Sequence, residues 1–162
     1  MIKQLNSSDF PRAAEIIRES FATVAEDLGF TEQTFPTFTG FVTTAERLQN
    51  HAAWGWLMYG LFENEQLVGY ASVSKVKDAD NVYELHNLAV LPDYRHKGYG
   101  KQLLDFCTAK VKELGGTKIT IGITEENTVL KNWYTANGFI HTSTKKFDHI
   151  PITVGFMEWE AK

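Results

Sequence analysis

The sequence predicts one α/β domain built on a single sheet of mixed strand direction. Its 162 residues match the size of one domain, and 43% hydrophobic with 22% charged residues is typical of a chain with an ordinary globular core. Apolar residues recur at helical spacing in some segments and follow strand-like patterns in others. No repeat, linker or low-complexity segment divides the pattern, so residues 1–162 are expected to form a single domain.

The first part of the chain is predicted to be a short strand followed by helices. Residues 2–5 form the strand, and the side chains of residues 7–9 can cap the helix that begins at Phe10. Gly29 is a suitable end for that helix. Its apolar positions at helical spacing are Phe10, Ala13, Ala14, Ile17, Phe21, Val24 and Leu28. Residues 41–50 repeat a helical pattern, so a second helix is expected there.

The rest of the chain alternates between strands and helices. Residues 56–76 read as an antiparallel hairpin that turns at Glu63–Gln66, and the turn at residues 78–81 leads into a third long strand. This third strand covers residues 82–91. It is followed by a helix from Tyr99 to Leu114, a strand over 117–123, a helix over 127–137, and strands over 139–147 and 152–159. The resulting order is β-α-α-β-β-β-α-β-α-β-β, a mixed and mostly antiparallel sheet of about seven strands flanked by about four helices.

Within the last two helices, the spacing predicts which side chains are buried. Tyr99, Leu103, Cys107, Val111 and Leu114 share one helix face, and Gly115–Gly116 ends that helix. The shorter helix is expected to bury Leu130, Trp133 and Tyr134 and to end through a left-handed turn at Asn137–Gly138.

Composition excludes several classes of function. The formal charge of −4 argues against a duplex nucleic-acid partner and fits a cationic small molecule or a peptide amine. The single cysteine allows neither an internal disulfide nor a thiolate metal cluster, which suits the reducing cytoplasm. The N-terminal residues do not resemble a signal peptide, and no stretch approaches the ~20 apolar residues of a membrane span, so no membrane partner is expected.

The segment RHKGYGK, residues 95–101, joins a predicted strand to a predicted helix. Amides in the first turn of a helix have no partner within the helix, and glycines let a ligand come close to the backbone. The segment therefore could bind a phosphate or pyrophosphate, with added charge from Arg95, His96, Lys97 and Lys101. The alternative is a tight turn with solvated cations. A Walker loop is excluded by the spacing, and a dinucleotide fingerprint is excluded by Leu103.

Two motifs surround this segment. The first follows the pattern V-x-P-x-Y-R-x-x-G-x-G/A through Val90, Pro92, Tyr94, Arg95, Gly98 and Gly100, and the second consists of Asn127, Tyr134 and Gly138–Phe139. Together they resemble the two signatures of the GNAT superfamily of acyl-CoA-dependent N-acetyltransferases. The matched region runs from Glu84 to about His141, whereas the first eighty residues fit only as a coarse pattern. The resemblance implies the GNAT fold and acetyl-CoA as co-substrate.

The resemblance also assigns residues to acetyl-CoA. The loop amides would bind the pyrophosphate, the end of the preceding strand would pair with the pantetheine arm, and the Asn127 side chain would contact that arm. The implied binding residues are Leu88, Ala89, Val90, Arg95, His96, Lys97, Gly98, Tyr99, Gly100, Lys101 and Asn127. Asn127 is also a plain helix N-cap, and both roles can hold together.

Acetyl transfer to an amine needs a base, a polarised thioester carbonyl and an acid for the thiolate. The resemblance implies that the Val90 N–H faces the thioester oxygen and that Tyr134 protonates the sulfur of CoA. The alternative for Tyr134 is a core tyrosine that packs beside Trp133.

Glu84 is the candidate base by resemblance, because histone-acetylating members carry a glutamate at this spacing before the Val90 position. Strand alternation places Glu84, His86, Leu88 and Val90 on one face, and a partly dry cleft would raise the pKa of a carboxyl group. His86 and a water molecule are the competing bases. The alternative for Glu84 is a solvated glutamate that attracts a cationic acceptor.

No metal is expected, because His51, His96, His141 and His149 lack a metal-ligand spacing. Cys107 is expected in the core rather than in a covalent step. The sequence therefore predicts an N-acetyltransferase that acts by direct attack in a ternary complex, on a polyamine, amino sugar, amino acid derivative or protein amine. The competing function is an acyl-CoA sensor of the same fold without turnover. The resemblance also allows a homodimer, since many relatives pair through their last strands.

Overall fold

The computed structural model describes every residue from 1 to 162 and confirms the predicted fold class. Seven strands form one sheet in the order β1-β2-β3-β4-β5-β7-β6, in which β4 and β5 run parallel while β1–β2, β2–β3, β5–β7 and β6–β7 are antiparallel pairs. The strands are β1 (Ile2–Gln4), β2 (Leu57–Glu63), β3 (Gln66–Lys75), β4 (Val82–Val90), β5 (Lys118–Thr124), β6 (Ile140–Lys146) and β7 (Thr153–Glu160). The helices are α1 (Phe10–Leu28), α2 (Thr39–Val42), α3 (Ala45–Ala53), α4 (Tyr99–Glu113) and α5 (Thr128–Ala136), with single 3₁₀ turns at Ser7–Asp9 and Pro92–Tyr94.

The predicted helix over 41–50 is wrong in one respect, because the structure has two helices there. The backbone is extended at Thr43 and Thr44, which separates the single turn of α2 from α3. The Thr44 side chain accepts a hydrogen bond from the Arg47 N–H at 3.1 Å. A threonine that caps a helix favours an extended backbone at its own position, so the helical pattern is interrupted at this residue.

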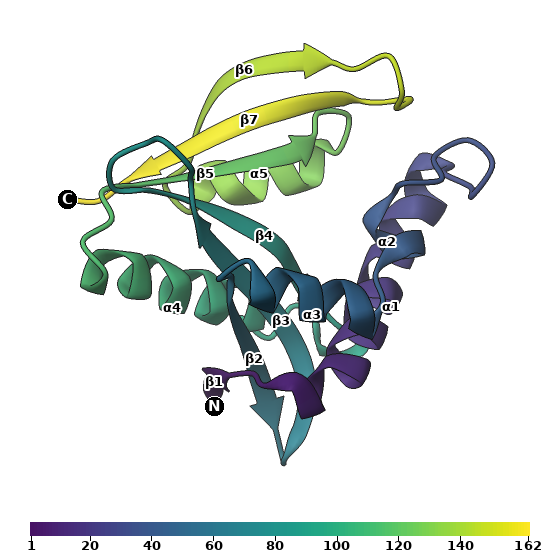
Figure 1. Ribbon diagram of the computed structural model, residues 1–162. Helices are drawn as coiled ribbons and strands as arrows, with labels where there is room; N and C mark the ends of the chain where they lie inside the picture. The colour runs from purple at the N-terminus through teal and green to yellow at the C-terminus, as the bar shows by residue number, and fades with distance from the viewer. The chain divides into compact units, whose positions relative to one another are not determined.

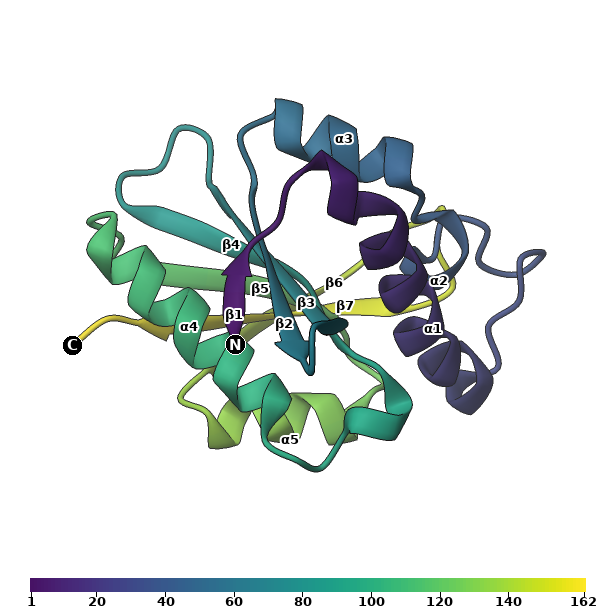
Figure 2. The same cartoon turned by 90° about the horizontal axis from the view of Figure 1, so that it is seen from below.

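The chain divides into two compact units, which are described separately. The first unit contains residues 1–74 and 85–107. In it, α1 and α3 cover one face of β2 and β3, and the first turns of α4 cover the other face (Figure 2). The Tyr59 and Phe106 rings meet at 4.9 Å across the α4 side. The core of this unit includes Ala13, Ile16, Ile17, Leu48, Leu61, Val68, Val73 and Leu103, all buried.

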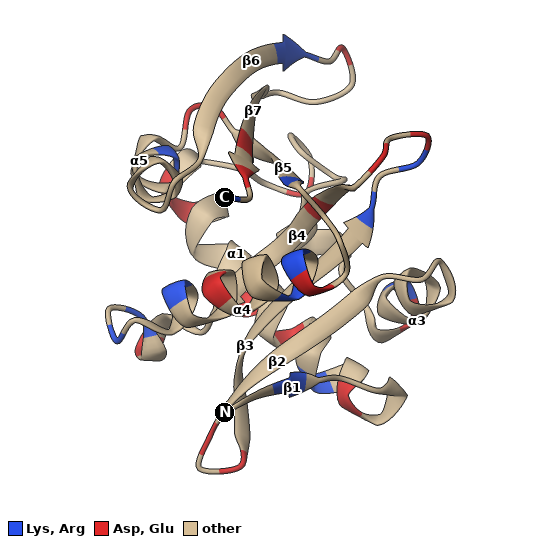
Figure 3. Cartoon of the chain, turned by 90° about the vertical axis from the view of Figure 1, so that its left-hand side faces the viewer, with Lys and Arg blue, Asp and Glu red and all other residues tan.

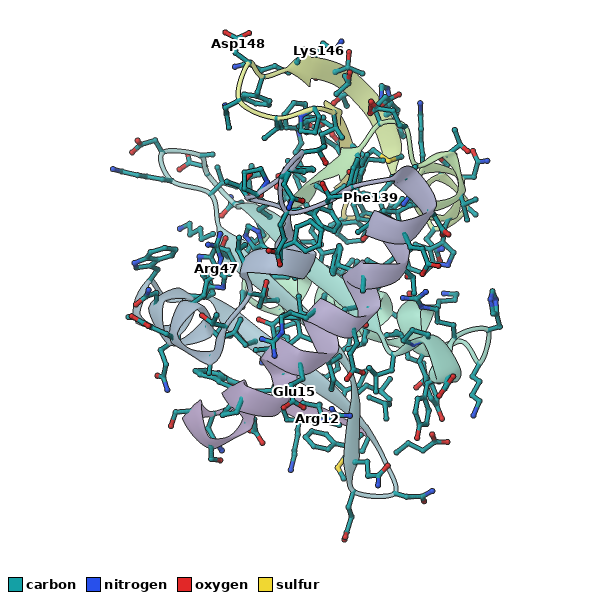
Figure 4. The ribbon with its side chains drawn as sticks, turned by 90° about the vertical axis from the view of Figure 1, so that its right-hand side faces the viewer. Arg12, Glu15, Arg47, Phe139, Lys146 and Asp148 are labelled. Carbon is teal, nitrogen blue, oxygen red and sulfur yellow. The ribbon has the colours of Figure 1, made fainter.

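The second unit contains residues 75–84 and 108–162. Its strands β5, β7 and β6 lie side by side (Figure 1), and α5 contacts β6. The core of this unit includes Val111, Ile119, Ile121, Phe139 and Met157. The tip of the β6–β7 hairpin is polar, since Lys146 and Asp148 stand exposed at its outer end (Figure 4).

Turn chemistry explains where the elements end. Asn64 and Glu65 both have positive φ, at 50° and 67°, which closes the β2–β3 hairpin where it was predicted. This turn is acidic, and the end of β6 is basic (Figure 3). Gly29 at φ 76° ends α1, and Gly138 at φ 93° follows α5, so both predicted glycine positions are confirmed.

Four predictions of buried side chains are wrong. Tyr99 is only partly buried at the first position of α4, where its hydroxyl donates to Glu63. Leu114 is 46% exposed, because α4 ends at Glu113 and Leu114 already lies in the turn that leads to Gly115. Leu130 and Trp133 are only partly buried, and Tyr134 is the buried residue of α5. A helix of nine residues covers little of a sheet, so few of its positions can be buried. None of the helices is both long enough and apolar enough to cross a membrane.

Candidate active site

The loop between β4 and α4 presents a run of unpaired backbone amides. The N–H groups from His96 to Lys101 donate to no protein acceptor, and the first hydrogen-bonded amide is that of Gln102, which donates to the Gly98 carbonyl at 3.0 Å. His96 and Gly98 have positive φ, at 63° and 82°, which curves the loop. Open amides at the N-terminus of a 15-residue helix are suited to bind an anion, because the helix dipole also favours negative charge there.

Arg95 does not take part in this run. Its N–H donates to the Pro92 carbonyl at 3.2 Å, and its guanidinium donates to three other protein oxygens. Nε reaches the Val90 carbonyl at 3.1 Å, Nη1 reaches Thr23 Oγ1 at 2.9 Å and Nη2 reaches the Ser20 carbonyl at 2.8 Å. The Arg95 guanidinium is thus engaged with protein oxygens in this structure, and its contribution to an anion site stays a prediction. The guanidinium joins α1 to the end of β4.

The other cations of the loop differ in how they are held. His96 and Lys97 are exposed, and Lys97 Nζ lies 5.2 Å from the centre of the Tyr94 ring. Lys101 pairs with Asp105 at 2.8 Å on the surface of α4. The Tyr99 hydroxyl donates to Glu63 at 2.8 Å, which ties the start of α4 to the β2–β3 hairpin. Lys97 thus remains as an exposed cation next to the open amides, with the exposed His96 side chain beside it.

Strand β4 is not regular over the residues expected to meet acetyl-CoA. Asn87 has φ 53°, so the alternation of side chains predicted for His86, Leu88 and Val90 does not hold through this position. Ala89 is buried, whereas Leu88 and Val90 are partly buried. The left-handed backbone of Asn87 is the physical reason why side-chain alternation breaks here, because alternation requires extended backbone at every position.

His86 lies in a stack of rings that sequence patterns did not reveal. The Trp56 indole is stacked between two imidazoles, with centroid distances of 3.8 Å to His86 and 3.9 Å to His51. His86 Nε2 also lies 2.8 Å from Ser74 Oγ. Burial, and to a smaller extent His51, lowers the pKa of His86 to about 4. His86 is therefore neutral at pH 7 and a weak base. The positions of Trp56, His51 and His86 in the sequence give no signal that these three rings stack on one another.

Glu84 lies on β4 in the second unit, where it pairs in register with Thr120 of β5. Burial raises the pKa of its carboxyl group above the ordinary range. A carboxylate with a raised pKa holds a proton more strongly, so it is better suited to accept one from an ammonium than a solvated carboxylate is.

Asn127 and Tyr134 are both set by α5. Asn127 Oδ1 accepts from the Leu130 N–H at 3.2 Å, so the residue is the N-cap of this helix. Tyr134 is buried, and its ring makes edge contacts with Phe139 at 5.2 Å and Trp133 at 5.0 Å. The capping and packing alternatives are thus correct descriptions of these residues, and they leave the roles toward acetyl-CoA open.

The structure groups the predicted site residues as follows. The first unit brings the end of β4 (Leu88–Val90) together with the loop and with His86. The second unit holds Glu84, Asn127 and Tyr134. A surface pocket of about 380 Å³ also lies in the first unit, lined by Glu19, Ala22, Leu91, Pro92, Asp93 and Tyr94. Its two carboxylates give it an acidic wall.

Comparison with known proteins gives a consistent result. The sequence model of the acetyltransferase (GNAT) family matches residues 13–139. A spermidine N(1)-acetyltransferase of Thermoplasma acidophilum is 26% identical over 154 residues, covering 92% of this chain and 93% of that protein. A ribosomal protein bS18-alanine N-acetyltransferase of Haemophilus influenzae is 30% identical over 99 residues, covering 61% of this chain and 65% of that protein.

A solved structure shares the fold. The crystal structure of PaiA N-acetyltransferase from Thermoplasma acidophilum in complex with coenzyme A superposes with a TM-score of 0.80 at 23% identity. The superposition covers 99% of this chain and 98% of that chain, so the two share the fold over nearly their whole length.

Proposed function

The chain belongs to the acetyltransferase (GNAT) family and is an acyltransferase, and from this premise we propose that it transfers an acetyl group from acetyl-CoA to a primary amine. Direct attack of the amine on the thioester in a ternary complex fits the residues present, because Cys107 is fully buried and cannot serve as an exposed acyl carrier. We also propose that residues 1–162 act as one acetyltransferase domain, in the cytoplasm.

The observation that carries the proposal is the set of open amides from His96 to Lys101. A diphosphate offers several acceptor oxygens close together, which matches a curved run of N–H donors. The coenzyme A bound by the structural neighbour supports the same choice of ligand. Leu88, Ala89 and Val90 are proposed to pair with the pantetheine arm, and Asn127 is proposed to contact it.

Two side chains are proposed for the chemistry. Tyr134 donates a proton to the departing sulfur, as the matched family signature implies. Glu84 accepts a proton from the ammonium of the acceptor, directly or through water, and so frees the amine that attacks the thioester; the raised pKa of its carboxyl group supports this role. His86 is less suited to that task, since burial lowers its pKa to about 4 and Nε2 already faces Ser74.

The amine acceptor is proposed from the chemistry that two relatives share. The named substrates of those relatives are spermidine and the alanine of a ribosomal protein, and both present a primary amine. The acidic formal charge of −4 and the carboxylates of the pocket at Glu19 and Asp93 are compatible with a cationic acceptor.

The test is release of free CoA thiol from acetyl-CoA with a panel of amines: spermidine, an alanine-initiated peptide, a lysine peptide and an amino sugar. We expect release with at least one of them, together with heat of CoA binding in calorimetry. Binding of CoA without thiol release across the panel would favour the sensor function. No binding at millimolar CoA would reject the anion site itself.

Tyr134→Phe tests the proposed acid. The ring and its contacts with Phe139 stay, and only the hydroxyl is lost. Turnover should fall by about 100-fold, the lower end of what a positioned general acid contributes, while affinity for acetyl-CoA stays near normal. Turnover equal to the wild type would remove Tyr134 from the mechanism.

A further inference from the structure

Glu125 lies in the second unit and has no role in the acetyl transfer proposed above. It follows β5 directly and precedes the N-cap Asn127, so it lies in the short connection that leads into α5. Its carboxylate is shared between two elements. Oε1 accepts from Lys131 Nζ on α5, and Oε2 lies 2.9 Å from His141 Nε2 on β6.

A third element completes the surroundings of this carboxylate. Oε2 sits directly over Gly155 of β7, where an added Cβ would collide with it. The Glu125 N–H donates to the Thr153 carbonyl at 2.9 Å, so the backbone of the residue is fixed to β7 as well. The hydrogen bonds from Lys131 and His141 lower the pKa of the Glu125 carboxyl group, which keeps it ionised.

Helix α5 needs such a contact, because its own packing is limited. It has nine residues, about 13 Å of helix, and Tyr134 is its buried residue. Helices this short are marginal by themselves and take their position from tertiary contacts. One buried ring fixes the distance of a helix from a sheet but leaves rotation about that ring, and a second contact one turn away removes this freedom. Lys131 lies three positions before Tyr134 and supplies that second contact.

We propose that Glu125 is a positioning residue, which through Lys131 and His141 fixes the rotation of α5 and thereby the placement of the Tyr134 hydroxyl. The catalytic part of this inference depends on the proposed function, whereas the structural part does not. Displacements of about 1 Å in a catalytic group can cost about 100-fold in rate, so loss of the contact should be visible in turnover.

The catalytic test is a pair of substitutions made in two backgrounds. Glu125→Gln and Lys131→Met should each lower kcat by about 10- to 100-fold in the wild-type background. In a Tyr134→Phe background, where no hydroxyl remains to be placed, Glu125→Gln should lower kcat by less than about 3-fold. An equal loss in both backgrounds would indicate general destabilisation and overturn the inference. No loss in either background would overturn it too.

Glu126→Gln is the matched control. The neighbouring carboxylate accepts from the Thr153 N–H at 3.1 and 3.3 Å, so its side-chain hydrogen bonds go to β7 and not to α5. The same charge is removed from the same loop, so kcat should stay within about 2-fold of the wild type. A loss equal to that of Glu125→Gln would mean that any change in this loop suffices, which overturns the specific role of Glu125.

A second readout does not need turnover. Hydrogen exchange of the amides in α5 should be about 10-fold faster in Glu125→Gln than in the wild type and unchanged in Glu126→Gln. Gly155→Ala, which displaces the carboxylate without changing charge, should give the same acceleration. If no amine supports thiol release, the proposed function fails while this readout still decides the inference. Unchanged exchange in both Glu125→Gln and Gly155→Ala would overturn it.

Discussion

Replacement of Arg95 by alanine tests the contact between α1 and the end of β4. The substitution removes three hydrogen bonds from a charged donor, to Val90, Thr23 and Ser20. Each such bond contributes about 1–1.5 kcal/mol net in a partly buried place, whereas release of the long side chain returns about 2 kcal/mol of conformational free energy. The free energy of unfolding should therefore fall by about 2 kcal/mol, which lowers Tm by about 4–8 °C for a chain of this size.

The assay is urea denaturation followed by circular dichroism, with Arg12→Ala as the matched control. Arg12 pairs with Glu15 at 3.0 Å on the same helix α1, but their side chains are 46% and 51% exposed. That ion pair should contribute less than about 0.5 kcal/mol. If Arg95→Ala and Arg12→Ala change the free energy of unfolding equally, the reasoning about the partly buried guanidinium is refuted.

The same variant separates two views of the loop. Because the guanidinium points to α1, Arg95→Ala should weaken CoA binding by less than about 3-fold, through looser ordering of the loop alone. A direct charge-assisted bond to the diphosphate would contribute about 1.5–3 kcal/mol, and its loss would weaken binding by about 10- to 100-fold. Calorimetry with CoA distinguishes these results, and a loss of the larger size would show that Arg95 reaches the ligand.

Three further predictions concern the site. Glu84→Gln should abolish the acidic limb of the pH–rate profile. Burial raises the pKa of the Glu84 carboxyl group, so wild-type turnover should fall as pH decreases through a value above the usual glutamate range. An acidic limb that is unchanged in Glu84→Gln would exclude Glu84 as the base. Trp56→Ala should expose His86 and raise its pKa from about 4 toward 6.5, measured by NMR titration, and a value that stays near 4 would contradict burial as the cause. Gly98→Ala should weaken CoA binding by about 10-fold, since φ 82° costs an L-residue about 1–2 kcal/mol, and unaltered affinity would show that the loop does not need this conformation to bind.

Local signals explain how much of the fold could be predicted. The glycines at 29 and 138, the Asn64–Glu65 turn and the helical spacing in α1 each act within a few residues, so the sequence shows them directly. The loop between β4 and α4, and the start of α4 at Tyr99, were predictable for the same reason. The break at Thr43–Thr44 was missed because apolar spacing continues on both sides of a capping residue.

Contacts between distant parts of the chain explain what was missed in the site. Arg95 meets Ser20 and Thr23, which are more than seventy positions away in the sequence, so a cation next to a glycine loop could equally well face the ligand. The stack of His51, Trp56 and His86 depends on a helix, a loop and a strand meeting. Pattern reasoning gives the residues of each element, and tertiary packing decides which of them meet.

The open amides from His96 to Lys101 have a consequence for how the protein responds to acidity. Peptide N–H groups neither gain nor lose a proton between pH 5 and 9, so a ligand held by them keeps these bonds across that range. Any dependence of the reaction on acidity should then arise from ionisation of Glu84, of the incoming amine, or of the bound nucleotide itself. Binding of acetyl-CoA and deprotonation of the acceptor amine would thus depend on pH in different ways. A change in one of these steps could then occur without loss of the other.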